Sequence, residues 1–262
     1  MSGFDPKNYW EQRLATSTGL EGVGYLGLGQ PFNEWMYRVR RWNFKRFVAH
    51  HMPQRAQRTV LDVGSGTGEY LRLWKQLGLG AIVGSDLTVT AVERLSAAHP
   101  GMTIFRMDIS AADAPLSSTY DAISCMDVLF HIVDDSRFAQ ALSNFRRALK
   151  PDGLLFLSDN FQHRKTSHQE HFVNRSLDEY ETALHQAGFR VIMRRPVFHL
   201  LNRPTDSDAP MLHRWWSMVG RTCARSHRLG GWLAAIAYPF ELLITSLRRE
   251  GASTEIMVCA PL

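Results

Sequence analysis

The sequence is poor in cysteine, and the few that it has exclude two kinds of stabilising site. Its 262 residues include three cysteines, Cys125, Cys223 and Cys259, which lie far apart and form no CxxC pair. This spacing suits neither a disulfide framework nor a structural zinc site. No group of His, Asp and Glu has the spacing of metal ligands, so we expect no metal. A scattered, odd number of cysteines is typical of a reducing compartment.

Long hydrophobic runs are also missing. The first ten residues, MSGFDPKNYW, have no apolar core like that of a signal peptide. The most apolar stretch, Gly231–Leu247, spans about 17 residues and contains Pro239 and Glu241, whereas a membrane-spanning helix needs about 20 residues. We therefore expect a soluble, cytoplasmic protein.

No excess of one charge dominates the chain. Lys and Arg outnumber Asp and Glu by 30 to 25, and 45% of the residues are hydrophobic. This is globular composition and excludes a disordered or collagen-like chain. The basic excess is split between residues 1–58 (nine basic, four acidic) and 190–262 (ten and five), around an acidic middle (eleven and sixteen). Because nucleic-acid binders concentrate Lys and Arg on one element, we expect no nucleic-acid partner.

From residue 59 onward, short apolar runs alternate with stretches of helical periodicity. Strands are expected at 59–63, 81–85, 103–107, 120–126, 154–158, 190–198 and 254–260, and helices at 70–77, 89–98, 136–149 and 176–187. This alternation predicts an α/β fold with a doubly wound parallel sheet and helices on both faces. About 55 residues separate the last two strands, which is too long for an unstructured connection, so we expect a helical insertion there.

The N-terminal region is expected to be largely helical. Asp5 and Pro6 are suited to begin a helix over residues 5–16. Residues 19–31 contain five glycines and a proline, which predicts a loop. Residues 32–51 alternate aromatic and basic side chains and predict a basic amphipathic helix.

A glycine-rich turn follows the first strand. Residues 60–68 read VLDVGSGTG and form a G-x-G-x-G pattern, which differs from the G-x-G-x-x-G of dinucleotide-binding turns. Asp62 precedes the turn and Glu69 lies just inside the next helix. Negative side chains there disfavour a pyrophosphate and suit a ligand with an ammonium group or another positive charge. A purely structural tight turn would show the same glycines.

Carboxylates follow the second and third strands as well. Asp86 lies twenty residues beyond Gly66, and Asp108 ends the third strand. A carboxylate at the tip of the second strand can accept hydrogen bonds from both hydroxyls of a ribose. One at the third can receive an exocyclic purine amine. Each alone is equally a helix cap, but three carboxylates on the ligand-binding edge of an open sheet favour a binding site.

These residues resemble class I S-adenosylmethionine-dependent methyltransferases. VLDVGSGTG is similar to the first motif of that family, GSDLT to the second and FRMDIS to the acidic turn after strand three. YDAISCMDVLFHIVDD and LKPDGLLFLSDN resemble its strand-four and strand-five segments. The resemblance implies a Rossmann-like seven-stranded sheet, mostly parallel, in which the last strand inserts antiparallel beside 190–198.

The resemblance also implies S-adenosylmethionine as cofactor and S-adenosylhomocysteine as product. It assigns the methionine part to the first motif, the ribose to Asp86, and the adenine to Leu87, Asp108 and Ile109. Cys125 and Met126 would flank the sulfonium through their backbone. The implied cofactor residues are Asp62, Gly64, Ser65, Gly66, Gly68, Asp86, Leu87, Asp108, Ile109, Cys125 and Met126.

The candidates for proton transfer follow strands four and five. An oxygen acceptor must lose a proton during methyl transfer and so calls for a base, whereas an amine or activated carbon need not. We expect the base among His131, Asp159 and His163, with Asp127 as a further candidate beside the acceptor. His131 is equally explained as a residue that closes a helix cap or lines the adenosine pocket.

The segments outside the core are expected to shape the acceptor pocket. We divide the chain into an N-terminal helical cap or lid (1–51), a cofactor-binding core (52–198), a helical insertion (199–253) and the last core strand (254–262). Candidate acceptor contacts are Tyr25, Tyr37, Asp127, Trp215 and Trp216. The insertion is alternatively a helical pair that only packs on the sheet edge. Its Arg-rich and apolar residues 214–249 also suit a peripheral membrane contact.

Several functions fit these observations. The first is O-methylation, in a biosynthetic reaction, of a small molecule, a sugar or a lipid-linked glycan. The second is N- or C-methylation of a metabolite, lipid or quinone. More distant alternatives are an NAD(P)-dependent oxidoreductase and a non-catalytic S-adenosylmethionine-binding module. We expect a monomer or a homodimer.

Overall fold

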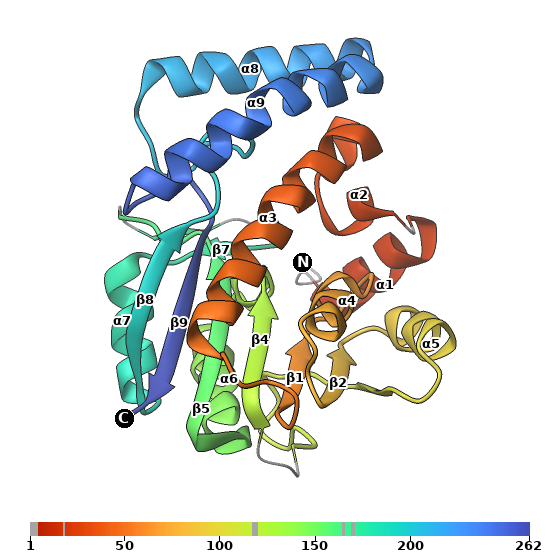
Figure 1. Ribbon diagram of the computed structural model, residues 1–262, viewed down its shortest axis with the longest axis vertical. Coiled ribbons are helices and arrows are strands. Elements are labelled where there is room, and N and C mark those ends of the chain that lie inside the picture. Colours follow the sequence, from red (N-terminus) through yellow and green to blue (C-terminus); the bar gives the residue numbers. More distant parts are fainter. Residues whose placement is uncertain (1–4, 18, 117–119, 164–165, 169–170) are drawn as a thin grey trace.

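A seven-stranded sheet forms the centre of the computed structural model, which describes residues 5–17, 19–116, 120–163, 166–168 and 171–262 (Figure 1). The strand order is β3-β2-β1-β4-β5-β9-β8. Strands β1 to β5 run parallel, and β9 lies antiparallel between β5 and β8. The Rossmann-like architecture expected from the sequence is therefore confirmed. The strands are β1 (Thr59–Val63), β2 (Ala81–Asp86), β3 (Thr103–Arg106), β4 (Tyr120–Met126), β5 (Leu149–Asp159), β8 (Phe189–Pro196) and β9 (Glu255–Pro261).

Two hydrophobic cores lie on opposite faces of this sheet. Successive strand residues alternate between them: Val60 belongs to one core and Leu61 to the other, as expected for side chains that alternate along a strand. Helices α3 (Gly29–His51) and α4 (Glu69–Gln76) cover the first face, and α6 (Asp135–Ala148) and α7 (Leu177–Gln186) the second. Helix α5 (Val89–Ala98) packs beside β2 and β3.

The N-terminal segment differs from its expected form in one place. Asp5 caps α1 (Pro6–Thr16) as expected, but residues 19–31 are not a loop. They form the short helix α2 (Leu20–Val23), the 3-10 turn η1 (Leu26–Leu28) and the first turn of α3. Arg13 stabilises this compact path by donating to the backbone carbonyls of Gly22 and Gly24. The glycines are compatible with a loop, but the hydrogen bonds from Arg13 stabilise helical turns instead.

The insertion before the last strand is helical, as expected. Helix α8 (Pro210–Arg225) and helix α9 (His227–Leu247) form a hairpin above the sheet, and α9 packs against α3 (Figure 1). Glu241 anchors the hairpin from within, because its carboxylate accepts backbone hydrogen bonds from His199, Leu200 and Leu201. Among the described residues, α9 alone is long and apolar enough to cross a membrane, and 33% of its most apolar stretch is buried.

Two short elements complete the chain. The 3-10 turn η2 (Leu129–His131) follows β4, and a small ladder joins β6 (Ser167–His168) to β7 (Val173–Asn174). Neither was expected from the sequence. Both lie beyond the carboxyl ends of the central strands, where the connections of a parallel sheet shape a ligand site.

Candidate active site

A cavity of about 740 Å³ lies at the carboxyl ends of β1, β2 and β4 and is covered by α1. It brings together many of the residues that the sequence selected. These are Tyr37, Gly64, Ser65, Gly66, Asp86, Leu87, Asp108, Ile109, Met126, Asp127 and His131. The cavity also has walls that the sequence analysis missed, among them Lys7, Trp10, Tyr70, Arg106 and Arg137.

The glycine turn adopts a conformation that requires glycine. Gly64, Gly66 and Gly68 have φ values of 74°, 51° and 78°, in the left-handed region that side chains with a Cβ disfavour. A Cβ on Gly64 would also collide with the Val128 side chain. The amides of Gly64 and Ser65 donate to the Ser85 carbonyl at 2.9 Å. The turn is thus tied to β2, and bare backbone lines the cavity floor.

Asp62 lies directly beneath this turn. Its side chain is 1% exposed, and one carboxylate oxygen accepts a 2.6 Å hydrogen bond from Ser124 Oγ. The other oxygen is buried and has no hydrogen-bond partner within the described part of the chain. Burial raises the pKa of Asp62 to about 7. Asp62 does not itself line the cavity. A ligand group that reached the base of the turn would meet an oxygen that is suited to receive a donor.

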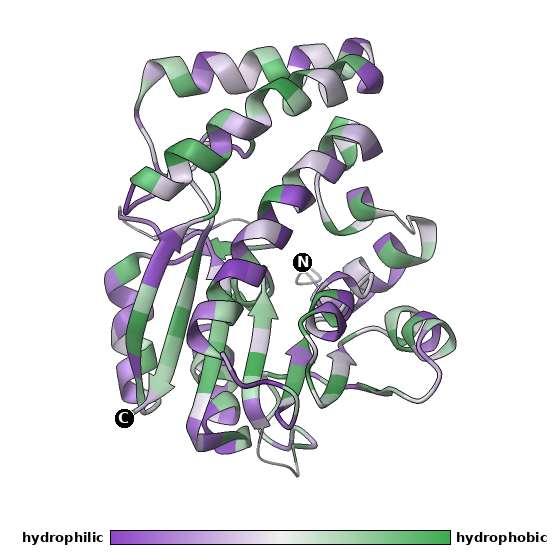
Figure 2. Ribbon diagram, in the orientation of Figure 1, coloured by the Kyte–Doolittle hydropathy of each residue, from purple (hydrophilic) through white to green (hydrophobic). Residues whose placement is uncertain are grey.

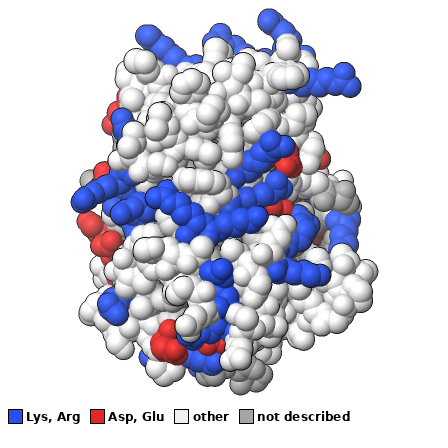
Figure 3. All heavy atoms as spheres, in the orientation of Figure 1, with Lys and Arg blue, Asp and Glu red and all other residues white. Residues whose placement is uncertain are grey.

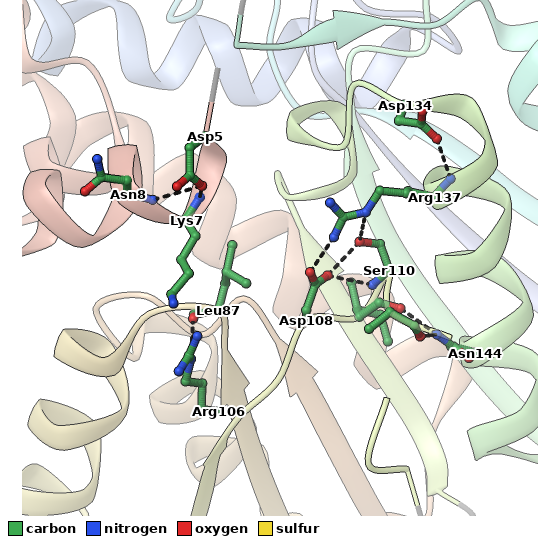
Figure 4. A network of polar contacts seen from close by, with 12 residues as sticks. Asp5, Lys7, Asn8, Leu87, Arg106, Asp108, Ser110, Asp134, Arg137 and Asn144 are labelled. Atoms are coloured by element: carbon green, nitrogen blue, oxygen red, sulfur yellow. Dashed lines mark hydrogen bonds and ion pairs between the residues drawn. The ribbon is translucent and has the colours of Figure 1, made fainter. Parts of the chain in front are cut away.

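Asp86 and Asp108 are already oriented by neighbouring donors. Asp86 accepts from the Gly66 amide at 2.8 Å and from the amide and hydroxyl of Thr88. Asp108 accepts from Ser110 and forms an ion pair with Arg137 (Figure 4). Their carboxylates are therefore held in place at the carboxyl ends of β2 and β3, where the sequence placed the ribose and adenine contacts.

Helix α1 closes the cavity from the opposite side. Lys7 points from α1 toward the turn that carries Leu87, and Arg106 donates to the Leu87 carbonyl (Figure 4). Trp10 packs edge-on against His131 with ring centroids 4.8 Å apart. No local pattern marked the α1 residues as part of a site, because their position depends on how α1 docks.

A partly buried ion pair lies beside the tip of β4. Asp127 has a φ of 58° and forms a salt bridge with Arg40 of α3. Burial raises the pKa of Asp127, while the Arg40 charge opposes that rise. Sequence reasoning selected Tyr37 but missed Arg40. Their spacing of three residues, which places both on one helix face, is the signal that could have found it.

His131 is held in one tautomer. Its Nδ1 lies 3.0 Å from the backbone carbonyl of His171 and must donate to it, which leaves Nε2 unprotonated in the neutral ring. Burial lowers the pKa of His131 to about 4. The imidazole is therefore neutral throughout the physiological range.

The other two candidate bases do not line the cavity. Asp159 ends β5, is 1% exposed and accepts a hydrogen bond from the hydroxyl of Tyr180. His163 lies farther along the chain and contacts Asp206 at 2.5 Å. Both side chains have partners within the protein that hold them outside the cavity wall.

The remaining sequence candidates also lie outside the lining. Cys125 is fully buried in the core between β4 and α6, and Gly68 caps α4. Tyr25 contacts Trp216 of α8, with ring centroids 5.8 Å apart, and Trp215 donates to the Leu200 carbonyl at 2.8 Å. These aromatic residues join the insertion to the N-terminal segment. Within the described residues, no group of three or more His, Cys, Asp and Glu could hold a metal ion.

The buried carboxyls predict how stability depends on pH. Burial raises the pKa of both Asp62 and Asp159 to about 7, above the value near 4 of an unfolded chain. Between pH 4 and 7 the folded protein therefore holds protons that the unfolded chain releases, so stability falls as pH rises. We expect Asp159→Asn, which keeps the shape of the neutral acid, to reduce this fall by about 1 kcal/mol or more. Urea denaturation at pH 5, 6 and 7.5 measures the free energy of unfolding. If this free energy fell with pH as steeply in the variant as in the unchanged protein, Asp159 would not have the raised pKa.

The residues present fit S-adenosylmethionine, the cofactor implied by the motifs. The unpartnered oxygen of Asp62 and the side-chain-free turn above it suit an ammonium group and a close backbone contact. Oriented carboxylates at the ends of β2 and β3 suit a nucleoside.

Comparison with known proteins identifies the family. A family model described as a methyltransferase domain matches residues 32–193. A ubiquinone biosynthesis O-methyltransferase from Haemophilus ducreyi is 34% identical over 107 residues, which are 38% of this chain and 44% of the relative. A tRNA U34 carboxymethyltransferase from Pseudoalteromonas translucida is 30% identical over 121 residues, 44% of this chain and 36% of the relative. The chain thus spans less than half the length of these curated relatives.

Solved structures show the same fold. An S-adenosylmethionine-dependent methyltransferase from Leishmania major superposes with a TM-score of 0.57 at 19% identity, covering 71% of this chain and 74% of the other. A TehB-like methyltransferase from Corynebacterium glutamicum gives 0.51 at 14% identity, covering 87% and 98%. Because the family model spans most of the sheet and its glycine turn, the chain belongs to the class I S-adenosylmethionine-dependent methyltransferases.

Proposed function

We propose that this protein transfers a methyl group to an oxygen atom of a small molecule, a sugar or a lipid-linked glycan. The observation that carries the proposal is the neutral His131 with its unprotonated Nε2 in the wall of the cofactor cavity. An acceptor hydroxyl must lose its proton as its oxygen bonds to carbon, and a side chain that accepts a proton meets this need. The similarity to O-methyltransferases of ubiquinone biosynthesis supports the same chemistry.

The cavity residues would divide the work of binding. Asp62 and the glycine turn would hold the methionine part, Asp86 the ribose, and Leu87, Asp108 and Ile109 the adenine. When bound, S-adenosylmethionine supplies a methyl group on a positively charged sulfur. Helix α1 covers the cavity and would exclude water from the reacting groups.

His131 is the better candidate for the base than Asp127. The Asp127 carboxylate is engaged in an ion pair with the Arg40 guanidinium, and this pair would be lost if Asp127 took up the acceptor proton. Within the described part of the chain the His131 ring takes part in no ion pair, and its pKa of about 4 keeps Nε2 unprotonated above pH 5. In this proposal, the acceptor proton moves to Nε2 while the carbon–sulfur bond breaks.

The first test is the chemistry and pH dependence of methyl transfer. Labelled S-adenosylmethionine is supplied with a panel of phenols, sugar alcohols and amines, and the methylated atom is found by mass spectrometry and NMR. We expect an O-methyl product. With S-adenosylmethionine saturating, the kcat/KM for the acceptor should not decline between pH 8 and 5.5, because His131 stays neutral there. A free imidazole would protonate near pH 6.5.

The variant His131→Ala should lower kcat by about 10²–10⁴-fold, the range for loss of a general base. Affinity for S-adenosylhomocysteine should stay close to that of the unchanged protein. His185→Ala removes an exposed histidine of α7 and serves as the matched control. A nitrogen- or carbon-methylated product, or full activity of His131→Ala, would favour N- or C-methylation of a metabolite, lipid or quinone instead.

A further inference from the structure

An apolar stripe runs along the outer side of α9. Six large side chains of this helix are 50% to 77% exposed, although large hydrophobic residues are elsewhere mostly in the two cores. At 100° per residue they fall within an arc of about 80°, and they extend over about 27 Å of helix. Figure 2 shows hydrophobic segments spaced along α9. The α9 stripe consists of Leu229, Trp232, Ile236, Phe240, Leu243 and Leu247.

The opposite side of α9 packs against the rest of the protein. Ala234 and Ala237 are buried in the core that includes α3, and Glu241 is 0% exposed with three backbone donors on its carboxylate. If α9 left the protein to span a bilayer, this carboxylate would lose its three backbone donors and would enter the bilayer without a hydrogen-bond partner. The helix is therefore suited to lie along a surface and not to cross it.

Positive charge surrounds the stripe. Between Asp208 and Glu250 the only acidic residue is the buried Glu241, so every exposed charge of α8 and α9 is basic. Figure 3 shows Lys and Arg, and no Asp or Glu, along the top edge of the visible face, where α8 lies. The exposed arginines are Arg214, Arg221, Arg225, Arg228, Arg248 and Arg249.

The outer side of α8 carries both exposed apolar side chains and positive charge. Met211 and Met218 are exposed on the same helical face as Arg214, Arg221 and Arg225, within an arc of about 80°. A nucleic acid would use the arginines but would leave the apolar side chains in water. Only a surface that is both anionic and apolar satisfies both sets.

We propose that the α8–α9 hairpin binds the surface of an anionic phospholipid bilayer. The α9 stripe would enter the boundary between headgroups and acyl chains, and the arginines would contact lipid phosphates. Large contiguous apolar patches are uncommon on the surface of monomers and mark contact surfaces. The proposal concerns binding alone and does not depend on which atom of the acceptor is methylated.

The test is sedimentation of the full chain with vesicles. Pure phosphatidylcholine vesicles are compared with vesicles that contain 30% phosphatidylglycerol. We expect binding to the anionic vesicles, at least tenfold weaker binding to the neutral ones, and a loss of binding as salt is added.

Two sets of variants separate the apolar and basic contributions. The triple variant Trp232→Ser, Ile236→Ser and Phe240→Ser should abolish binding, because it removes half of the α9 stripe. The variant should still fold, because all three side chains are exposed and contribute little to the core. Arg221→Glu with Arg225→Glu should weaken it by at least 25-fold, at about fivefold for each arginine lost. Two control sets make the same kinds of substitution at exposed positions outside the hairpin and should bind normally. They are Val89→Ser with Ile192→Ser and Leu262→Ser, and Lys75→Glu with Arg190→Glu.

A single fluorophore reports where the helix lies. Cys125, Cys223 and Cys259 are buried, so an Ile236→Cys variant can be labelled selectively with an environment-sensitive dye. Its emission should shift to shorter wavelength on anionic vesicles, whereas a dye on Arg190→Cys should not. Three results would overturn the proposal. The first is that the protein does not bind vesicles, and the second is that the control variants lose as much binding as the test variants. The third is that the protein is a dimer that does not bind vesicles and that the triple serine variant converts to a monomer.

Discussion

Replacing Glu241 with alanine should lower the free energy of unfolding by about 3–5 kcal/mol. The carboxylate accepts from the backbone amides of His199, Leu200 and Leu201 at 2.6, 2.7 and 2.5 Å, and it is fully buried. Without it, one buried and two partly buried amide donors lose their acceptor, and the loss for a buried donor costs about 1–3 kcal/mol. Urea denaturation followed by circular dichroism measures the change.

Two further variants make this prediction specific. Glu241→Gln keeps one acceptor oxygen and should lose less stability than Glu241→Ala, so a ranking can be obtained even if the alanine variant folds poorly. Glu93→Ala removes an exposed glutamate of α5 and should change stability by less than about 0.5 kcal/mol. If Glu241→Ala were as stable as Glu93→Ala, the hairpin would not depend on this carboxylate.

Replacing Asp86 with alanine should weaken binding of S-adenosylhomocysteine by about 10- to 150-fold. Hydrogen bonds to a charged group contribute about 1.5–3 kcal/mol, and Asp86 also holds the Gly66 amide and Thr88 in place. The variant would therefore lose both a direct ligand contact and the orientation of the glycine turn. Isothermal titration calorimetry with S-adenosylhomocysteine measures this loss.

The matched control is Asp178→Ala, which removes an exposed carboxylate from the first turn of α7. Its affinity for S-adenosylhomocysteine should equal that of the unchanged protein. Normal affinity in Asp86→Ala would remove this carboxylate from the binding site, whatever the acceptor of the reaction proves to be.

The position of α1 shows what sequence patterns left open. Residues 5–16 were expected to form a helix, and Asp5 does cap it. Nothing in that pattern placed Trp10 against His131. The docking depends on distant contacts, such as the Glu11 carboxylate that accepts from the amides of Val89 and Thr90 at the start of α5. Helical periodicity reports which face is apolar and not what that face meets.

The candidate bases make the same point. His131, Asp159 and His163 all follow strands whose ends face the cofactor edge, so the sequence could not rank them. The structure places His131 in the cavity wall and turns Asp159 toward Tyr180 and His163 toward Asp206. A register position predicts the edge of the sheet on which a residue lies, but side-chain partners decide whether it reaches the ligand.

The amino-acid sequence by itself determined the seven strands of the main sheet and the helices between them, the glycine turn and the carboxylates at the strand ends. These are local features, set by periodicity and backbone conformation, and parallel strands necessarily bring their carboxyl ends to one edge. Only the tertiary structure decided that Arg40 pairs with Asp127, that α1 covers the cavity, and which side of α9 stays exposed. Each of these depends on packing between segments far apart in the chain, which no local pattern encodes.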